Sequence, residues 1–232
     1  RAWVVHRRPT LKRVPDADPP EGFDYDLWVG PAPWRPYNPL MTHYNWHFIP
    51  DYGTGEMGNW GAHWLDVVRW FLGLRYPSAV SGAAGTFVVR DAKETPDTQT
   101  ILYEYPGLTV LWEERLWCDQ GMDGDEVGAE IWGDKGILRI TRGGWTFRPT
   151  DGKPEKHGGS EIEVPHATSF LEAIRGTGRP AAPIEEGCLS AALCHYGNVA
   201  CRAGRRLRID PENGAIVGDP EASALSERPN RS

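Results

Sequence analysis

The sequence predicts an α+β protein: one open, largely antiparallel β-sheet with helices packed on one of its faces. Between residues 78 and 148, short runs rich in β-branched and aromatic residues alternate with turn signals such as Pro106-Gly107. That pattern is typical of successive antiparallel strands with short connections. Helical patterns stand before and after these runs, at 55–73 and 169–204, so the helices can cover one face of the sheet.

The elements follow this order along the chain. Residues 9–36 are rich in proline and acidic residues, which predicts an irregular segment with one short helix. A capping-box pattern, Ser169 with Glu172, predicts the start of the second helix, and small side chains let the helix over 184–204 pack closely. We expect a single domain over residues 1–210 and a polar, loose tail over residues 211–232. The expected strands cover 2–5, 79–89, 98–105, 108–117, 126–133, 136–141, 144–149 and 205–210.

Composition narrows the possible partners. The chain has 232 residues, 40% of them hydrophobic, and a net charge of −7 without a dense basic cluster. Nucleic acid and anionic membrane surfaces are therefore not expected as partners, and no apolar run is long enough to span a bilayer. The four cysteines show no pairing or ligand spacing, which favours a reducing compartment and predicts a cytoplasmic protein.

The eleven tryptophans allow two interpretations. Several stand beside polar residues, as Trp46 does beside His47 and Trp60 beside Asn59. They can fill the core, as large aromatic side chains usually do, or they can line a pocket in which the apolar face of a sugar stacks on indole.

The stretch GEMGNWGAHWLDVVRWFLG (55–73) carries the strongest chemical pattern. Wound as a helix, it places Asn59, His63 and Asp66 at i, i+4 and i+7, on one face. An imidazole exchanges a proton near neutral pH, an amide can orient a hydroxyl, and a carboxylate can fix the tautomer of the ring. This face is predicted to be the floor of a substrate cleft, with His63 as its proton-transfer residue; the alternative is a structural histidine.

A metal site is the competing interpretation of the preceding residues. His43, His47 and Asp51 are four apart and could join His63 around a metal ion. Pro50 breaks the helix that this arrangement needs, so no metal site is expected. Instead these side chains are expected to line the cleft beside His63, and the predicted substrate-binding residues are Asn45, His47, Asp51, Tyr52 and Asp66.

The segment over 55–73, preceded by HYNWHFIPDYGT, resembles the signature helix of the C-terminal domain of the Gfo/Idh/MocA oxidoreductases (glucose–fructose oxidoreductase, inositol dehydrogenase and relatives). The run SFLEAIRG and the residues after it are similar to the closing helices and last strand of that family, so the resemblance reaches from the first strand to about residue 210. It implies a dihydrodipicolinate-reductase-like domain that binds substrate and forms homo-oligomers. The Rossmann domain that binds NAD or NADP in the family is absent from this chain, which also has no GxGxxG after a strand.

The resemblance also implies roles for two residues. His63 matches the helix histidine that works with a carboxylate one turn earlier and with a lysine of the Rossmann domain. Together they take a proton from a sugar or cyclitol hydroxyl while hydride leaves to the nicotinamide. The usual aspartate position holds Asn59, and the resemblance predicts that Asn59→Asp retains activity.

Three function classes follow. The first is the substrate-binding part of an NAD(P)-dependent oxidoreductase acting on a sugar, cyclitol or glycoside hydroxyl. The second is a stand-alone carbohydrate-binding or assembly domain without redox activity, and the third is a metal-assisted sugar lyase or isomerase. A homo-oligomer built through the sheet is also expected, because a second face carrying Trp112, Leu116 and Trp132 would otherwise be exposed.

Overall fold

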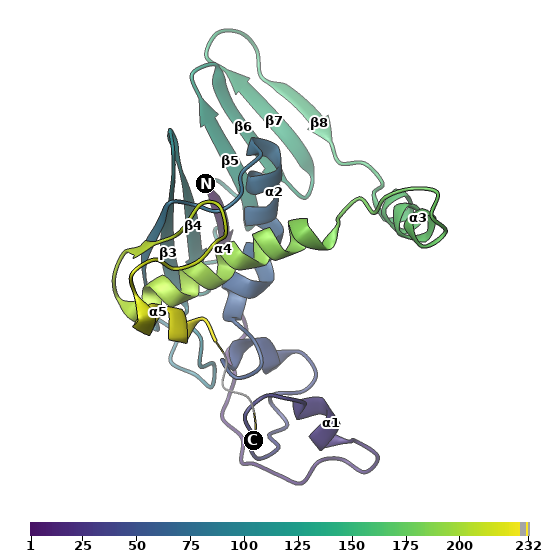
Figure 1. Ribbon diagram of the computed structural model, residues 1–232, viewed down its shortest axis with the longest axis vertical. Coiled ribbons are helices and arrows are strands. Elements are labelled where there is room, and N and C mark those ends of the chain that lie inside the picture. Colours follow the sequence, from purple (N-terminus) through teal and green to yellow (C-terminus); the bar gives the residue numbers. More distant parts are fainter. Residues whose placement is uncertain (228–230, 232) are drawn as a thin grey trace.

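Nine strands of the described residues, 1–227 and 231, form one open sheet in the computed structural model (Figure 1). The strands lie in the order β8-β7-β6-β5-β1-β4-β3-β2-β9. Only β1 and β4 pair in parallel, so the predicted largely antiparallel sheet is confirmed. The bounds are β1 (Ala2–Val5), β2 (Ala79–Gly85), β3 (Thr98–Tyr105), β4 (Leu108–Arg115), β5 (Val127–Gly133), β6 (Gly136–Thr141), β7 (Gly144–Pro149), β8 (Glu155–Gly158) and β9 (Leu207–Arg208).

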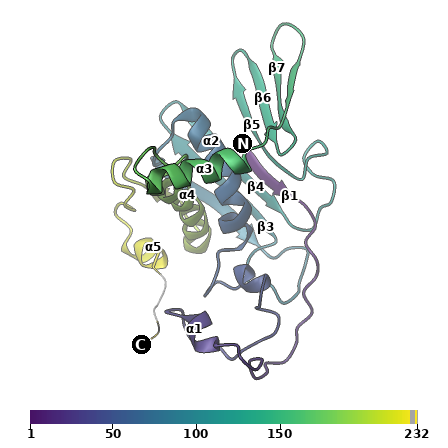
Figure 2. The ribbon, with the colours of Figure 1, turned by 90° about the vertical axis from the view of Figure 1, so that its right-hand side faces the viewer.

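Two long helices cover one face of this sheet. The helices are α1 (Tyr25–Val29), α2 (Ala62–Leu72), α3 (Glu163–Ile174), α4 (Ile184–Ala203) and α5 (Pro220–Leu225), with a 3₁₀ turn η1 (Asn45–Phe48) and a π turn η2 (Met57–Gly61). α2 and α4 pack on the sheet and on each other, whereas α3 stands away from it and buries no residue (Figures 1 and 2). No helix in the described part of the chain is long and apolar enough to cross a membrane.

Two boundaries differ from the sequence prediction. α3 begins at Glu163, with Pro165 in its first turn where proline fits, so the predicted start at Ser169 is wrong. The residues after 210 are also more ordered than expected: Ile216 bridges to Ile209, and α5 packs on α4 with Ala222 fully buried. Residues 228–230 and 232 of the predicted tail lie outside the described residues.

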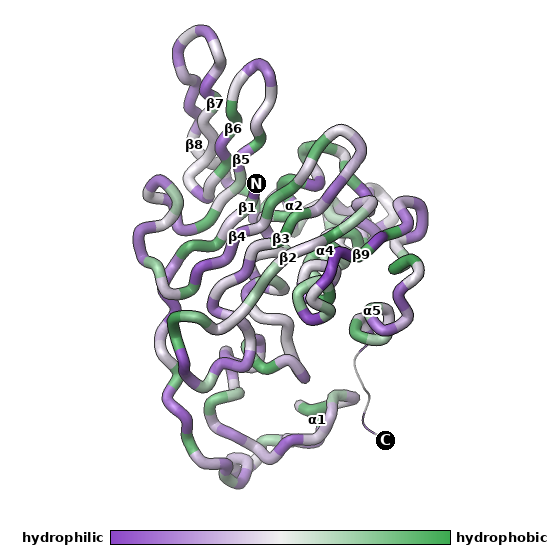
Figure 3. The backbone as a smooth tube through the Cα atoms, turned by 90° about the vertical axis from the view of Figure 1, so that its left-hand side faces the viewer, coloured by the Kyte–Doolittle hydropathy of each residue, from purple (hydrophilic) through white to green (hydrophobic). Residues whose placement is uncertain are grey.

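The main core lies between the sheet and its two helices. Alternate residues of the central strands point toward the helices, as Tyr103 and Trp112 do, and meet Leu65 of α2 and Leu193 of α4. Figure 3 shows hydrophobic residues along α2 and hydrophilic residues at the turns of the β5–β8 wing. A smaller aromatic cluster is formed by the segment predicted to be irregular and the residues that follow it. Its buried members are Tyr25, Val29, Ala32, Tyr37, Met41 and Ile49.

The residues on the outer face of the sheet differ from those expected. Trp112 and Leu116 lie in the helix-side core at 0% and 1% exposure, so the prediction that they form an exposed apolar face is wrong. Because a strand alternates its side chains, Glu113 faces outward, where it pairs with Arg1. Of the three apolar residues that supported an oligomer through the sheet, Trp132 alone is exposed, at 67%.

Candidate functional site

The signature segment forms a continuous helix with an irregular first turn. η2 carries Asn59, and α2 continues from it with His63 and Asp66. A π turn inside a helix is often found at a functional site. Gly73 ends α2 in the left-handed conformation, with φ of 62°, as the sequence predicts.

A buried carboxylate fixes the side chain of Asn59. Nδ2 of Asn59 donates a hydrogen bond to Oε2 of Glu56 at 2.9 Å, and Glu56 is 1% exposed. Nε of Arg8 lies 2.5 Å from Oε1 of Glu56, and Nε2 of His47 lies 3.6 Å from the same oxygen. Because the amide nitrogen is committed to Glu56, Oδ1 of Asn59 is left to accept a hydrogen bond from a ligand.

Glu56 is held in its charged form. Burial by itself raises the pKa of a carboxyl group, but hydrogen bonds from His47 and Arg8 and the charge of Arg8 outweigh it and lower the pKa of Glu56 below its usual value. A buried anion with charge-assisted partners is a firm anchor, since breaking such a pair costs about 3–5 kcal/mol.

An open groove of about 1490 Å³ begins at this network. Its walls come from residues 44–59, from the loop before β3 and from the outer side of α4, and Leu225–Glu227 close one end. Gln99 and Asn198 join two of these walls: Nε2 of Gln99 donates to Oδ1 of Asn198, whose Nδ2 donates to the carbonyl of Thr54. The groove is therefore lined by hydrogen-bonding groups, by the aromatic rings of Tyr44 and Trp46, and by apolar side chains such as Val199 and Leu225.

The structure brings four of the predicted site residues into this groove: His47, Asp51, Tyr52 and Asn59. Their side chains differ in availability. His47 is 7% exposed, and its Nδ1 lies 2.6 Å from the carbonyl oxygen of Tyr44. Asp51 pairs with Nε of Arg35 at 2.5 Å, and the ring of Tyr52 packs against Trp28 at 4.9 Å.

The other three predicted residues lie outside the groove. His63 is exposed on α2, one turn beyond Asn59, and its ring centroid is 5.5 Å from that of Trp60. Asp66 faces α4, where it accepts a hydrogen bond from Ser190 and pairs with Arg69. Asn45 is partly buried in η1. Asn59 therefore lines the groove and His63 lies exposed one turn further along the helix, whereas Asp66 serves the contact between the two helices.

Sequence reasoning did not single out Glu56 or Arg8. Glu56 stands three residues before Asn59, a spacing that brings side chains together on a helix and could have indicated the contact. Arg8 has no such local signal. It reaches Glu56 because the chain after β1 continues alongside the end of β4, where the amide of Arg8 donates to the carbonyl of Leu116.

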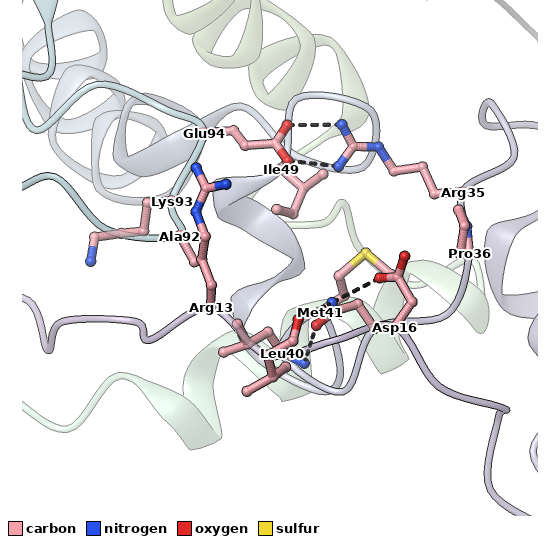
Figure 4. A pocket seen from close by; sticks show the side chains of 12 residues that line it. Arg13, Asp16, Arg35, Pro36, Leu40, Met41, Ile49, Ala92, Lys93 and Glu94 are labelled. Atoms are coloured by element: carbon pink, nitrogen blue, oxygen red, sulfur yellow. Dashed lines mark hydrogen bonds and ion pairs between the residues drawn. The ribbon is translucent and has the colours of Figure 1, made fainter.

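A second hollow of about 360 Å³ lies beside the aromatic cluster (Figure 4). Arg35 and Glu94 face each other across it in a bidentate pair at 2.8 and 2.9 Å. Asn38 donates to Asp16, and Lys93 pairs with Asp91. Most of its charges are therefore neutralised within the chain, which leaves little to bind a ligand.

Metal ligation was the competing interpretation of His43, His47 and Asp51. In the structure η1 ends at Phe48, before Asp51, so the three do not share a helical face. Within residues 1–227 and 231, no three His, Cys, Asp or Glu side chains are grouped so as to hold a metal ion.

Comparison with known families places the signature helix in context. Residues 3–111 match the family described as "Oxidoreductase family, C-terminal alpha/beta domain", that of Gfo, Idh and MocA. This segment is similar to a Gfo/Idh/MocA C-terminal domain. The family resemblance that the sequence predicts is therefore confirmed. A search among curated proteins finds no match.

Several solved structures share the fold of this chain. A levoglucosan dehydrogenase in complex with NADH and L-sorbose is 14% identical, with a TM-score of 0.59, over 73% of this chain and 55% of its own. The aldose–aldose oxidoreductase from Caulobacter crescentus, complexed with glycerol, is 18% identical, with a TM-score of 0.57, over 72% and 51%. An oxidoreductase from Agrobacterium radiobacter, in complex with NAD+, L-tartaric acid and magnesium, is 17% identical, with a TM-score of 0.51, over 64% and 47%. The chain spans about half the length of these proteins.

Proposed function

We propose that the chain is the substrate-binding part of an NAD(P)-dependent oxidoreductase that oxidises a hydroxyl group of a sugar, cyclitol or glycoside. The family match and the sugar-directed dehydrogenases that share its fold support this proposal. The observation that carries it is the arrangement of Asn59 and His63. Asn59 is fixed by the buried Glu56, and His63 is exposed one turn further along the same helix.

The two side chains divide the work at the reacting hydroxyl. The imidazole of His63 accepts its proton as a general base. Oδ1 of Asn59 accepts a hydrogen bond from the same or a neighbouring hydroxyl, because Nδ2 is bound to Glu56. His47 and Arg8 act behind them by keeping Glu56 charged and in place.

The described residues of this chain do not fit a nicotinamide dinucleotide. A dinucleotide cradle needs a glycine-rich turn between a strand and a helix, which aims backbone N–H groups at the pyrophosphate. Here β1 runs into the proline-rich segment, and the next helix, α1, has only five residues. We therefore assign NAD or NADP to a separate Rossmann domain and the substrate hydroxyl to this chain.

A carbohydrate-binding domain without redox activity is the second candidate, and the exposed rings of Tyr44 and Trp46 at the groove favour it. One variant separates the two functions. With the chain joined to its nucleotide-binding domain, His63→Ala should lower turnover by about two to four orders of magnitude, the usual range for a general acid–base, and leave sugar binding in place.

His166→Ala is the matched control, because His166 is exposed on the distant α3. It should leave turnover unchanged, and both variants should unfold within about 0.5 kcal/mol of the parent protein, as exposed substitutions do. Near-full turnover in His63→Ala, or its unfolding, would show that His63 is structural. Sugar binding with no turnover in the parent protein would select the second candidate.

A further inference from the structure

The hairpin between β6 and β7 brings a cation to the signature helix. Cζ of Arg142, at the tip of this hairpin, lies 4.8 Å from the centroid of the Trp60 ring. Strand β8 packs against this hairpin and supports it. Trp145 stacks on His157 of β8 at 4.2 Å, and a side chain at Gly144 would come within 2.0 Å of the carbonyl oxygen of His157. The guanidinium is therefore presented by a supported strand pair.

Trp60 connects this cation to the proposed proton-transfer residue. Its ring contacts the guanidinium of Arg142 and, at 5.5 Å and 54°, the imidazole of His63. A single monosaccharide whose hydroxyl meets His63 can therefore direct another substituent toward Arg142.

Arg142 lacks a counter-charge within the described residues. The other arginines of the β5–β8 wing, Arg139 and Arg148, both pair with Glu130. No acidic side chain among residues 1–227 and 231 forms an ion pair with Arg142, although the whole chain has a net charge of −7. Stacking on an indole occupies the face of a guanidinium and leaves the N–H groups in its plane free, and these fit a carboxylate or phosphate in bidentate fashion.

We propose that Arg142 binds an anionic substituent of the substrate, a carboxylate or a phosphate, while a hydroxyl of the same molecule faces His63. The substrate class is thereby narrowed from sugars in general to sugar acids and sugar phosphates. The inference rests on the proposed function, because it uses His63 as the residue that meets the hydroxyl. Arg142 determines which substrates bind, and Trp60 positions the guanidinium of Arg142.

Calorimetric titration of the chain with D-glucuronate, D-glucose 6-phosphate and D-glucose tests the proposal. At least one of the two anions should bind about tenfold more tightly than glucose at low salt, the equivalent of one charge-assisted contact. Arg142→Gln should abolish this preference and keep glucose binding. Arg148→Gln, a charge-matched change in the same wing, should keep the preference. Comparing the affinities of the two anions shows whether Arg142 binds a carboxylate or a phosphate.

Several outcomes would overturn the proposal: equal affinity for glucose and both anions, an anion preference that survives in Arg142→Gln, or no saturable binding of either anion. Arg142-dependent binding of NADH to this chain would also overturn it, since the site would then serve the phosphates of the cofactor. The proposed function fails separately. Full turnover in His63→Ala would refute the proposed function even where the anion preference depends on Arg142. NAD(P)-dependent oxidation of a neutral sugar that requires His63, with no anion preference, would refute only the inference.

Discussion

Replacing Asn59 by aspartate should destabilise the protein in a pH-dependent way. The family resemblance predicts that this variant retains activity, since aspartate is the usual residue at this position. The structure predicts that the variant loses stability, because Nδ2 of Asn59 donates to Oε2 of the buried Glu56 at 2.9 Å. Asn59→Asp removes the donor and sets a second carboxylate against an anion that Arg8 and His47 keep charged.

The size of the effect follows from the distance. Two unit charges about 3 Å apart repel by about 6 kcal/mol at an effective dielectric constant near 20. The pair can avoid this by sharing a proton, which at pH 7 costs a carboxyl of ordinary pKa about 4 kcal/mol. Protonation costs less than the repulsion, so the cost of protonation limits the loss of stability. We therefore expect the free energy of unfolding to fall by about 3–4 kcal/mol at pH 7.

The pH dependence is the sharper test. The pKa of the pair is raised in the folded state, so above the ordinary carboxyl range the folded protein binds more protons than the unfolded chain. Stability relative to the parent protein should therefore fall by about 1.4 kcal/mol per pH unit as the pH rises from about 5 toward 8. The difference should nearly vanish below about pH 4, where both states are protonated.

Urea denaturation of the parent protein and two variants across this pH range measures the effect. Asn59→Ala is the control: it loses one hydrogen bond to a charged group, about 1.5–3 kcal/mol, with no added pH dependence. If the difference in free energy of unfolding between Asn59→Asp and the parent protein did not change from pH 5 to 8, the reasoning would be refuted. That result would show that Asn59 and Glu56 do not share this contact.

Two further stability predictions follow from buried charges. Burial and the nearby charge of Glu56 raise the pKa of Glu114 well above its usual value, so stability is lost as the pH rises from the ordinary carboxyl range toward that raised pKa. Glu114→Gln should therefore raise the free energy of unfolding at pH 7–8 by on the order of 1–3 kcal/mol, measured by urea denaturation. The control variant Glu113→Gln loses its pair with Arg1 and should not become more stable. An equal gain of stability in both variants would contradict the argument from burial. Arg69, at 4% exposure, joins α2 to α4 through Ser190 and Glu186, and Arg69→Met should lower stability by about 2–4 kcal/mol. The exposed pair of Arg206 with Glu104 gives the control, since solvent screens this pair and Arg206→Met should cost far less than Arg69→Met. Equal losses of stability in the two variants would show that the Arg69 contacts do not hold α2 and α4 together.

The sequence by itself determined the fold class and the place of the signature helix. Alternation along residues 98–115 showed which strand residues share a face of the sheet, because a strand turns successive side chains to opposite faces. Gly73 and Gly204 marked the ends of α2 and α4, because both adopt the left-handed conformation that glycine favours. Both signals are local, so a single sequence carries them.

Periodicity along the sequence did not predict the features that depend on contacts between distant residues. It counts positions along a chain but does not say which sheet face the helices cover, so Trp112 and Leu116 were assigned to the wrong side. α3 carries no buried residue that would have marked its start.

Only the tertiary structure decided what surrounds the candidate site. Asn59 and His63 were visible as a helical pattern, but Arg8 reaches Glu56 across 48 positions of sequence, and Arg142 reaches Trp60 across 82. The parallel pairing of β1 with β4 and the hairpin of β6 with β7 create these contacts. A contact between distant residues depends on how the whole sheet closes, and no local pattern in the sequence records that.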